Sequence, residues 1–114
     1  MNKDSIKQAY ENGFCVINGR EYEFDKMKWK DAKRVFSFFL KNANSIEKGQ
    51  IDFIDREDFE KIEILMFGYM SFDGHLLSKI QDSHFDEYAE DYLELIMYGL
   101  SVFSYPFMKG SISV

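Results

Sequence analysis

Few residues in this chain have the type and spacing that chemistry requires. The two histidines are His75 and His84, and the alternation Asp82, His84, Asp86 brings two carboxylates and one imidazole together in sequence. Such groups can ligate a divalent metal, but a metal site needs further ligands, and the sequence marks none beside this trio. We therefore expect no metal site and interpret His84 as a loop or capping residue.

The single cysteine and the many carboxylates offer no catalytic arrangement either. Cys15 lies within a strand-like run, where a thiol is buried and inert, and no partner base is marked. The carboxylates lie on polar helix faces, whereas acid–base catalysis would need one of them to be desolvated. The glycines form no phosphate-binding loop. We expect no enzymatic activity, no catalytic residues and no cofactor.

The composition is typical of one globular domain. The chain has 114 residues, 46% of them hydrophobic and 30% charged, and domains usually have about 100–150 residues. We expect residues 1–114 to form a single domain, with residues 1–12 as a flexible segment that allows at most a short helical turn. One cysteine favours a reducing compartment, and neither a signal peptide nor a membrane span is evident. A cytoplasmic protein is expected.

The net charge of −6 is unevenly distributed. Residues 1–50 hold 10 Lys/Arg against 7 Asp/Glu, or +3, whereas residues 51–114 hold 4 against 13, or −9. The acidic half argues against binding of a nucleic-acid backbone, which needs clustered cations. It indicates either a solvated face that aids solubility or a surface for a basic partner.

The strongest local signal is a β-hairpin over about residues 13–24. Asn18-Gly19 separates two strand-like runs, and such a pair favours a type I′ turn because both positions need positive φ. The register that follows pairs Cys15 with Tyr22. The side chains that then share one face are Cys15, Ile17, Tyr22 and Phe24. That face must be covered, because a lone hairpin is only marginally stable in water.

Apolar side chains recur at helical spacing in three further segments. These amphipathic helices are expected at about residues 29–41, 56–70 and 85–104. Trp29 and Leu40 belong to the apolar stripe of the first, Asp55 caps the second, and Pro106 ends the third. A hairpin followed by three helices predicts an α+β domain that is mostly α.

The connecting segments are expected to be irregular. Residues 43–55 are interpreted as a loop, residues 71–74 as a turn, and residues 76–80 as a short element of unclear type. Acidic residues line the outer face of the expected last helix. They are Asp86, Glu87, Glu90, Asp91 and Glu94.

The chain contains more aromatic residues than one small core readily hides. Its 12 Phe, 7 Tyr and 1 Trp are accompanied by 6 Met. Most of them are expected to pack in the core, and a remaining exposed patch of aromatic and Met side chains suits binding of another helix. The predicted partner-binding residues are Phe36, Phe38, Phe39, Met97, Leu100, Phe103 and Phe107.

Two segments carry a resemblance to a known family. Residues 14–39 are FCVINGREYEFDKMKWKDAKRVFSFF, and residues 84–107 are HFDEYAEDYLELIMYGLSVFSYPF. A strand, tight turn and second strand precede an amphipathic helix, and an acidic segment led by Phe85 enters a last helix that finishes near a Phe. In this order the chain resembles the small tail assembly chaperones of tailed bacteriophages over roughly residues 14–107.

The resemblance implies a holding function rather than catalysis. Such chaperones bind the long, apolar, helical tape measure protein and keep it soluble while the tail tube subunits assemble around it. The expected partners are therefore a tape measure protein and the tail tube protein, in the cytoplasm of a bacterial host. The acidic exterior would attract Lys-rich clients.

A different class of function stays open from the residues themselves. The acidic second half could make the chain an inhibitor of a basic host protein, or a nucleic-acid mimic. Its binding would then depend strongly on salt. The exposed hairpin edge could also pair two copies of the chain into a homo-oligomer.

Overall fold

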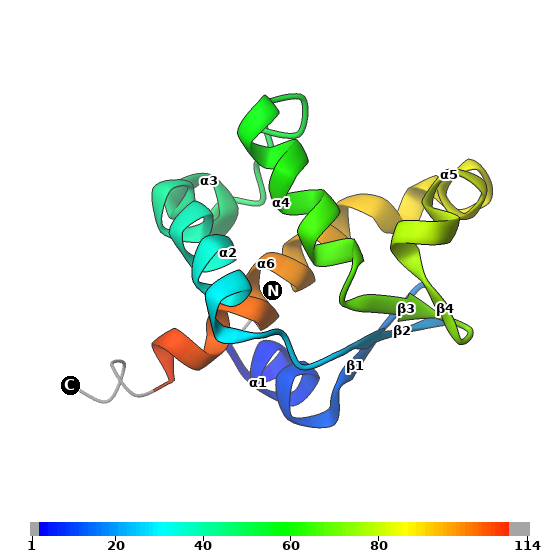
Figure 1. Ribbon diagram of the computed structural model, residues 1–114, viewed down its shortest axis with the longest axis horizontal. Coiled ribbons are helices and arrows are strands. Elements are labelled where there is room, and N and C mark those ends of the chain that lie inside the picture. The colour runs from blue at the N-terminus through cyan, green and yellow to red at the C-terminus, as the bar shows by residue number, and fades with distance from the viewer. Residues whose placement is uncertain (1–2, 110–114) are drawn as a thin grey trace.

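The computed structural model describes residues 3–109 and has the expected mostly helical α+β fold. Six α-helices and one 3-10 turn accompany a four-stranded antiparallel sheet in the order β1-β2-β3-β4 (Figure 1). In chain order the elements are α1 (Lys3–Asn12), β1 (Phe14–Ile17), β2 (Arg20–Phe24), α2 (Trp29–Lys41), α3 (Ala43–Glu47), α4 (Glu57–Phe67), β3 (Met70–Phe72), β4 (His75–Leu76), α5 (Leu77–Glu87), η1 (Ala89–Asp91) and α6 (Tyr92–Met108).

The predicted hairpin is confirmed in its turn, its register and its buried face. Asn18 and Gly19 have φ values of 52° and 80°, and Cys15 pairs with Tyr22. The side chains on the inner face are all buried, and they are Cys15, Ile17, Tyr22 and Phe24. The backbone conformation that Asn and Gly tolerate therefore fixes which face of the hairpin enters the core.

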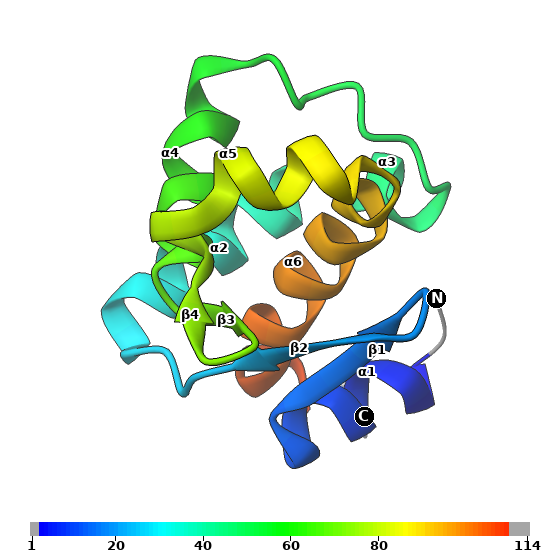
Figure 2. The same cartoon turned by 90° about the vertical axis from the view of Figure 1, so that its right-hand side faces the viewer.

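Helix α6 lies in the middle of the molecule. Its residues Leu95, Ile96 and Leu100 have no exposed surface, and its most extensive helix contacts are with α2 and α1. Figures 1 and 2 show the small sheet on one side of α6 and α4 on the other. The hydrophobic core is thus built around one helix, which the other elements cover.

Three segments that were expected to be flexible or irregular contain helix or strand. Residues 3–12, expected to be flexible, form helix α1, whose Ile6 and Ala9 are buried. The expected loop after α2 contains α3 with Ile46 buried. The turn expected over residues 71–74 is confirmed at Asp73-Gly74, but it belongs to a second hairpin in which β3 pairs with both β2 and β4. Each segment is ordered by a few apolar contacts with the core, which local propensity does not reveal.

The predicted helix over residues 85–104 is wrong at both ends. Helix α5 begins at Leu77 and ends at Glu87, Tyr88 leaves the helical conformation with φ −123° and ψ 48°, and α6 begins only at Tyr92. Pro106 lies inside α6 rather than ending it. A proline so close to a helix terminus removes one backbone hydrogen bond and leaves the earlier turns intact. Asp55 does not cap α4, whose N-cap position is Arg56.

Within residues 3–109, no helix is both long enough and apolar enough to cross a membrane.

Helix α6 packs closely against two methionines at Gly99. A Cβ atom added there would lie 3.2 Å from Met66 Sδ and 3.6 Å from Met70 Cε. Two methionines thus fill the space that a side chain would occupy. This explains a glycine in the middle of a helix, where its backbone freedom is otherwise unfavourable.

We expect Gly99→Val to lower the free energy of unfolding by about 1–3 kcal/mol, because the three added carbon atoms of the isopropyl group overfill this contact. The control is Gly99→Ala. Its single methyl group needs only a small shift of the flexible Met66 side chain, and alanine favours the helix by about 1 kcal/mol. Urea unfolding of the two variants measures the difference. Equal stabilities would contradict the packing role of Gly99.

Candidate functional site

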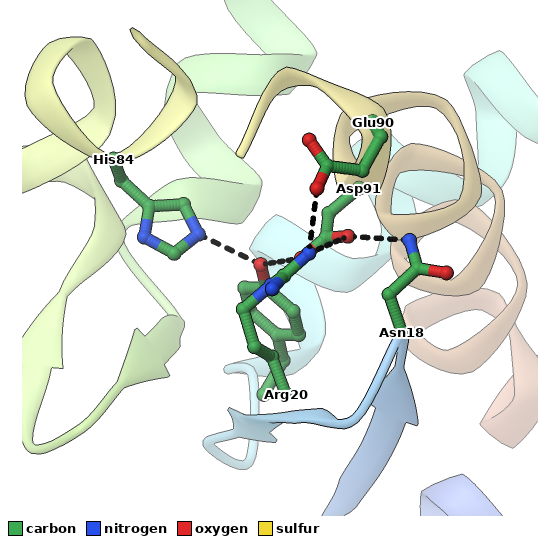
Figure 3. A network of polar contacts seen from close by, with 6 residues as sticks. Asn18, Arg20, His84, Glu90 and Asp91 are labelled. Atoms are coloured by element: carbon green, nitrogen blue, oxygen red, sulfur yellow. Dashed lines mark hydrogen bonds and ion pairs between the residues drawn. The ribbon is translucent and has the colours of Figure 1, made fainter. Parts of the chain in front are cut away.

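Side chains from the first hairpin converge on the carboxylate of Asp91 in η1 (Figure 3). Asn18 Nδ2 donates to its Oδ1 at 2.7 Å, and the Tyr22 hydroxyl donates to its Oδ2 at 2.5 Å. Arg20 donates to both oxygens, from Nη2 at 2.9 Å and from Nε at 2.6 Å. A bidentate arginine–carboxylate pair of this kind fixes both position and orientation.

Asp91 is fully buried, although the sequence placed it on an exposed acidic face. That expectation is wrong for Asp91 alone, since the other four acidic side chains of the face are exposed. Hydrogen bonding to Arg20 holds the pKa of the Asp91 carboxyl well below its usual range despite burial, and Tyr22 and Asn18 lower the pKa further. The carboxylate is therefore charged in the folded protein at neutral pH.

His84 joins the same cluster from α5. It is buried, and its Nε2 lies 2.7 Å from the Tyr22 hydroxyl oxygen. The only proton of that hydroxyl is donated to Asp91, so His84 Nε2 must be the donor in its own contact. Burial lowers the pKa of His84, so the imidazole is neutral at pH 7 with its proton on Nε2. The prediction of a loop or capping residue is wrong.

Asp82, His84 and Asp86 do not come together. All three lie on α5, where side chains two residues apart point in different directions, and both aspartates are exposed whereas His84 is buried. In the part of the chain that the structure describes, no group of three or more His, Cys, Asp or Glu side chains is placed to hold a metal ion.

The outer edge of the cluster is formed by Arg20. Its guanidinium contacts Glu90 at 2.9 Å and lies 4.0 Å from the centre of the Tyr88 ring. Tyr22 and Asp91 have no exposed surface, so a substrate has no access to their polar atoms. We interpret the cluster as a clamp that joins the first hairpin to η1 and α5. We refer to Asn18, Arg20, Tyr22, His84 and Asp91 as the polar clamp.

The accessible features lie at the other end of α6, where two surface grooves flank its C-terminal half. Groove 1 has a volume of about 760 Å³ and lies between the end of α1, residues 24–28, the start of α2, and α6. Trp29, Phe103 and Phe107 contribute to its largely apolar lining. Trp29 is 64% exposed, the highest value among the large hydrophobic side chains of the described residues.

Groove 2 has a volume of about 830 Å³ and lies between α1, α3 and α6. Its floor includes Phe39 from α2 and Met97, Tyr105 and Met108 from α6. The rim is polar and contains several lysines. An apolar floor with a polar rim is the usual anatomy of a surface that binds another protein.

The seven predicted partner-binding residues do not form one patch. Phe103 and Phe107 line groove 1, and Phe39 and Met97 line groove 2. The remaining three line neither groove, and they are Phe36, Phe38 and Leu100. Phe38 and Leu100 belong to the core with exposures of 5% and 0%, and Phe36 stacks on Phe107 with 4.9 Å between ring centres. The seven residues are therefore divided between two grooves, the core and a ring stack on Phe107, and their binding of a partner stays a prediction.

Trp29, expected in the apolar stripe of α2, is exposed instead. Ala32 is the first buried residue of α2, because Trp29 lies one turn before the helix reaches the core. Leu40, 58% exposed, is misplaced in the same way at the other end. The position in the helix could have revealed this exposure, since an apolar side chain in a terminal turn need not face the core.

The prediction that Cys15 is buried is confirmed, and burial raises the pKa of its thiol to about 12.

Strand β1 forms one edge of the sheet, and its outer face exposes Phe14 and Val16. The predicted pairing of two copies through this edge stays a prediction.

Replacing Asp91 by Asn tests the polar clamp. The variant leaves the Arg20 guanidinium without its buried counter-charge, so we expect the free energy of unfolding to fall by about 3 kcal/mol. The control is Glu90→Gln, which removes a carboxylate from the same guanidinium where the Glu90 side chain is 59% exposed. Its effect should stay below about 1 kcal/mol. Similar losses in urea unfolding would show that burial does not set the strength of the clamp.

Stability should also depend on pH through His84. Below about pH 6.5 the unfolded chain takes up a proton on this histidine that the folded chain, with its lowered pKa, does not. The free energy of unfolding should therefore fall as the pH decreases from about 7 to 5. A second fall, below about pH 4, should come from Asp91, because the unfolded chain then protonates this carboxyl first.

We expect His84→Gln to remove most of the dependence between about pH 7 and 5, because glutamine has no titrating group. Urea unfolding at several pH values measures it. His75→Gln, which replaces an exposed histidine, is the control and should retain the dependence. A His84→Gln variant with the wild-type pH profile would contradict this assignment.

No protein-family model, curated protein or solved structure matches the chain. Its function is therefore inferred from its own residues, and the two grooves are its candidate functional site.

Proposed function

We propose that the chain is a binding protein that holds an apolar helical segment of a client, and that it acts as a tail assembly chaperone for the tape measure protein of a bacteriophage. The observation that supports helix binding is the pair of apolar grooves along the C-terminal half of α6. An amphipathic helix binds such a groove through side chains spaced three, four and seven residues apart.

The side chains of the grooves suit a client that offers many similar apolar stripes. Met27 lines groove 1, and Met97 and Met108 line groove 2. The unbranched methionine side chain adapts to different apolar partners, so methionine-rich surfaces tolerate variation in the client sequence. A long apolar helical protein would otherwise aggregate through these stripes before assembly.

The resemblance of residues 14–39 and 84–107 to tail assembly chaperones supports the identity of the client. The proposed partners are the tape measure protein and, during assembly, the tail tube protein, in the cytoplasm of a bacterial host. The proposed activity is holding without catalysis, and it uses no cofactor.

Co-expression with the tape measure protein tests the proposal, with soluble client that co-purifies with this chain as the measurement. We expect Trp29→Glu to reduce co-purified client several-fold, because it places a charge at the mouth of groove 1. The matched control is Ile64→Glu on α4, since Ile64 is 60% exposed and lines neither groove. Circular dichroism should show both variants folded, because both side chains are mostly exposed.

Apolar binding should persist at high salt, where the Debye length shortens to about 3 Å at 1 M. Client that stays insoluble with the wild-type chain would contradict the proposal. Equal losses from Trp29→Glu and Ile64→Glu would exclude groove 1 as the binding surface. Salt-sensitive capture of a basic host protein instead of the client would favour the acidic-inhibitor function.

A further inference from the structure

The floor of groove 2 is a continuous stripe along α6. Met97, Ser101, Tyr105 and Met108 line the groove at spacings of four, four and three residues, so they lie on one face of the helix. The eleven residue-to-residue steps from Met97 to Met108 rise by about 16 Å along the helix axis. The groove is therefore long enough to lie alongside about three turns of a partner helix.

The rim of groove 2 is basic, in a protein whose net charge is −6. Lys3 and Lys7 come from α1, while Lys48 follows α3 and Lys109 follows α6. Two acidic residues, Asp4 and Glu47, share the rim, so four positive charges face two negative ones, a balance of +2. All four lysines are exposed, and none is in an ion pair within residues 3–109.

Groove 1 differs in this respect. Its rim carries Lys26 and Lys28 against Glu11 and Asp25, so its formal charges balance. The acidic excess of the chain lies elsewhere, for example in the first turn of α4. The two grooves are therefore similar in size and apolar lining but differ in charge.

We propose that groove 2 selects a helical client segment whose apolar stripe is bordered by aspartate or glutamate residues. The inference rests on the proposed helix-binding function and specifies its partner. Client carboxylates would lie near the lysines on both sides of the floor, where, among the described residues, the only rim lysine with a ring contact is Lys109, whose Nζ lies 5.5 Å from the centre of the Tyr10 ring. The local charge thus reverses the expectation, drawn from net charge, that Lys-rich clients are preferred.

The rim lysines affect mainly which client binds and how fast the client associates. An exposed ion pair contributes little affinity, whereas several like charges around one groove accelerate the approach of an opposite charge and disfavour a like one. The apolar floor supplies most of the affinity and the rim discriminates between clients. The rim effect must then weaken as salt increases, while floor binding persists.

Two synthetic helical peptides with the same leucine stripe test this inference, one with glutamate and one with lysine at the flanking positions. Fluorescence anisotropy of labelled peptide measures binding to the full chain at low and high salt. We expect the glutamate peptide to bind roughly tenfold tighter at low salt. The ratio should approach one at high salt.

The double variant Lys7→Glu, Lys48→Glu changes the charge of the rim from +2 to −2, so it should reverse this preference. The matched control is Lys26→Glu, Lys28→Glu, which makes the same charge change at groove 1 and should retain the preference. All four positions are exposed, so both variants should fold.

Each other outcome has a distinct meaning. Equal, salt-independent binding of both peptides would overturn the inference and leave the helix-binding function standing. Tighter binding of the lysine peptide would overturn the inference in favour of recognition by the acidic surface. Binding of neither peptide would overturn both the inference and the helix-binding function on which it rests.

Discussion

The buried ion pair between Arg20 and Asp91 is the interaction on which the arrangement of this chain most depends. The two residues are 71 positions apart in sequence, and their contact joins the first hairpin to the turn before α6. A buried charge is tolerable only when it is paired and hydrogen-bonded, and Asp91 receives bonds from Asn18, Arg20 and Tyr22. The apolar strand face can therefore pack on α6 only in the position that satisfies this carboxylate.

The same pair explains why the helical pattern from Phe85 onward is interrupted. The spacing of apolar residues continues without a break from α5 into α6, yet the backbone leaves the helix at Tyr88. This break places Asp91 in η1, where its side chain reaches Arg20, while the Tyr88 ring packs against the same guanidinium. A polar contact between distant residues here overrides local helix propensity.

This distinction decides how much could be predicted from the sequence. The hairpin register follows from Asn18-Gly19 and from alternation along two short strands, so it was predictable, as was α2 over residues 29–41. The break at Tyr88, the burial of Asp91 and the role of His84 depend on partners far away in sequence. The predicted partner-binding residues were apolar as required, but periodicity could not separate the core residue Leu100 from Met97, three positions before it, which lines groove 2.

Helix α6 runs from the polar clamp to the two grooves. The clamp residues that stabilise the fold and the α6 residues that line the grooves therefore lie toward opposite ends of the helix. Its first residue follows Asp91 directly, so one end of the helix is held by buried charge and hydrogen bonds. Its last turns carry Phe107 and Met108 between the grooves. There Pro106 removes a backbone donor. A helix fixed at one end can present its other end to a partner without that end being part of the most buried core. Substitutions at the groove mouths should then alter partner choice while the polar clamp continues to hold the fold.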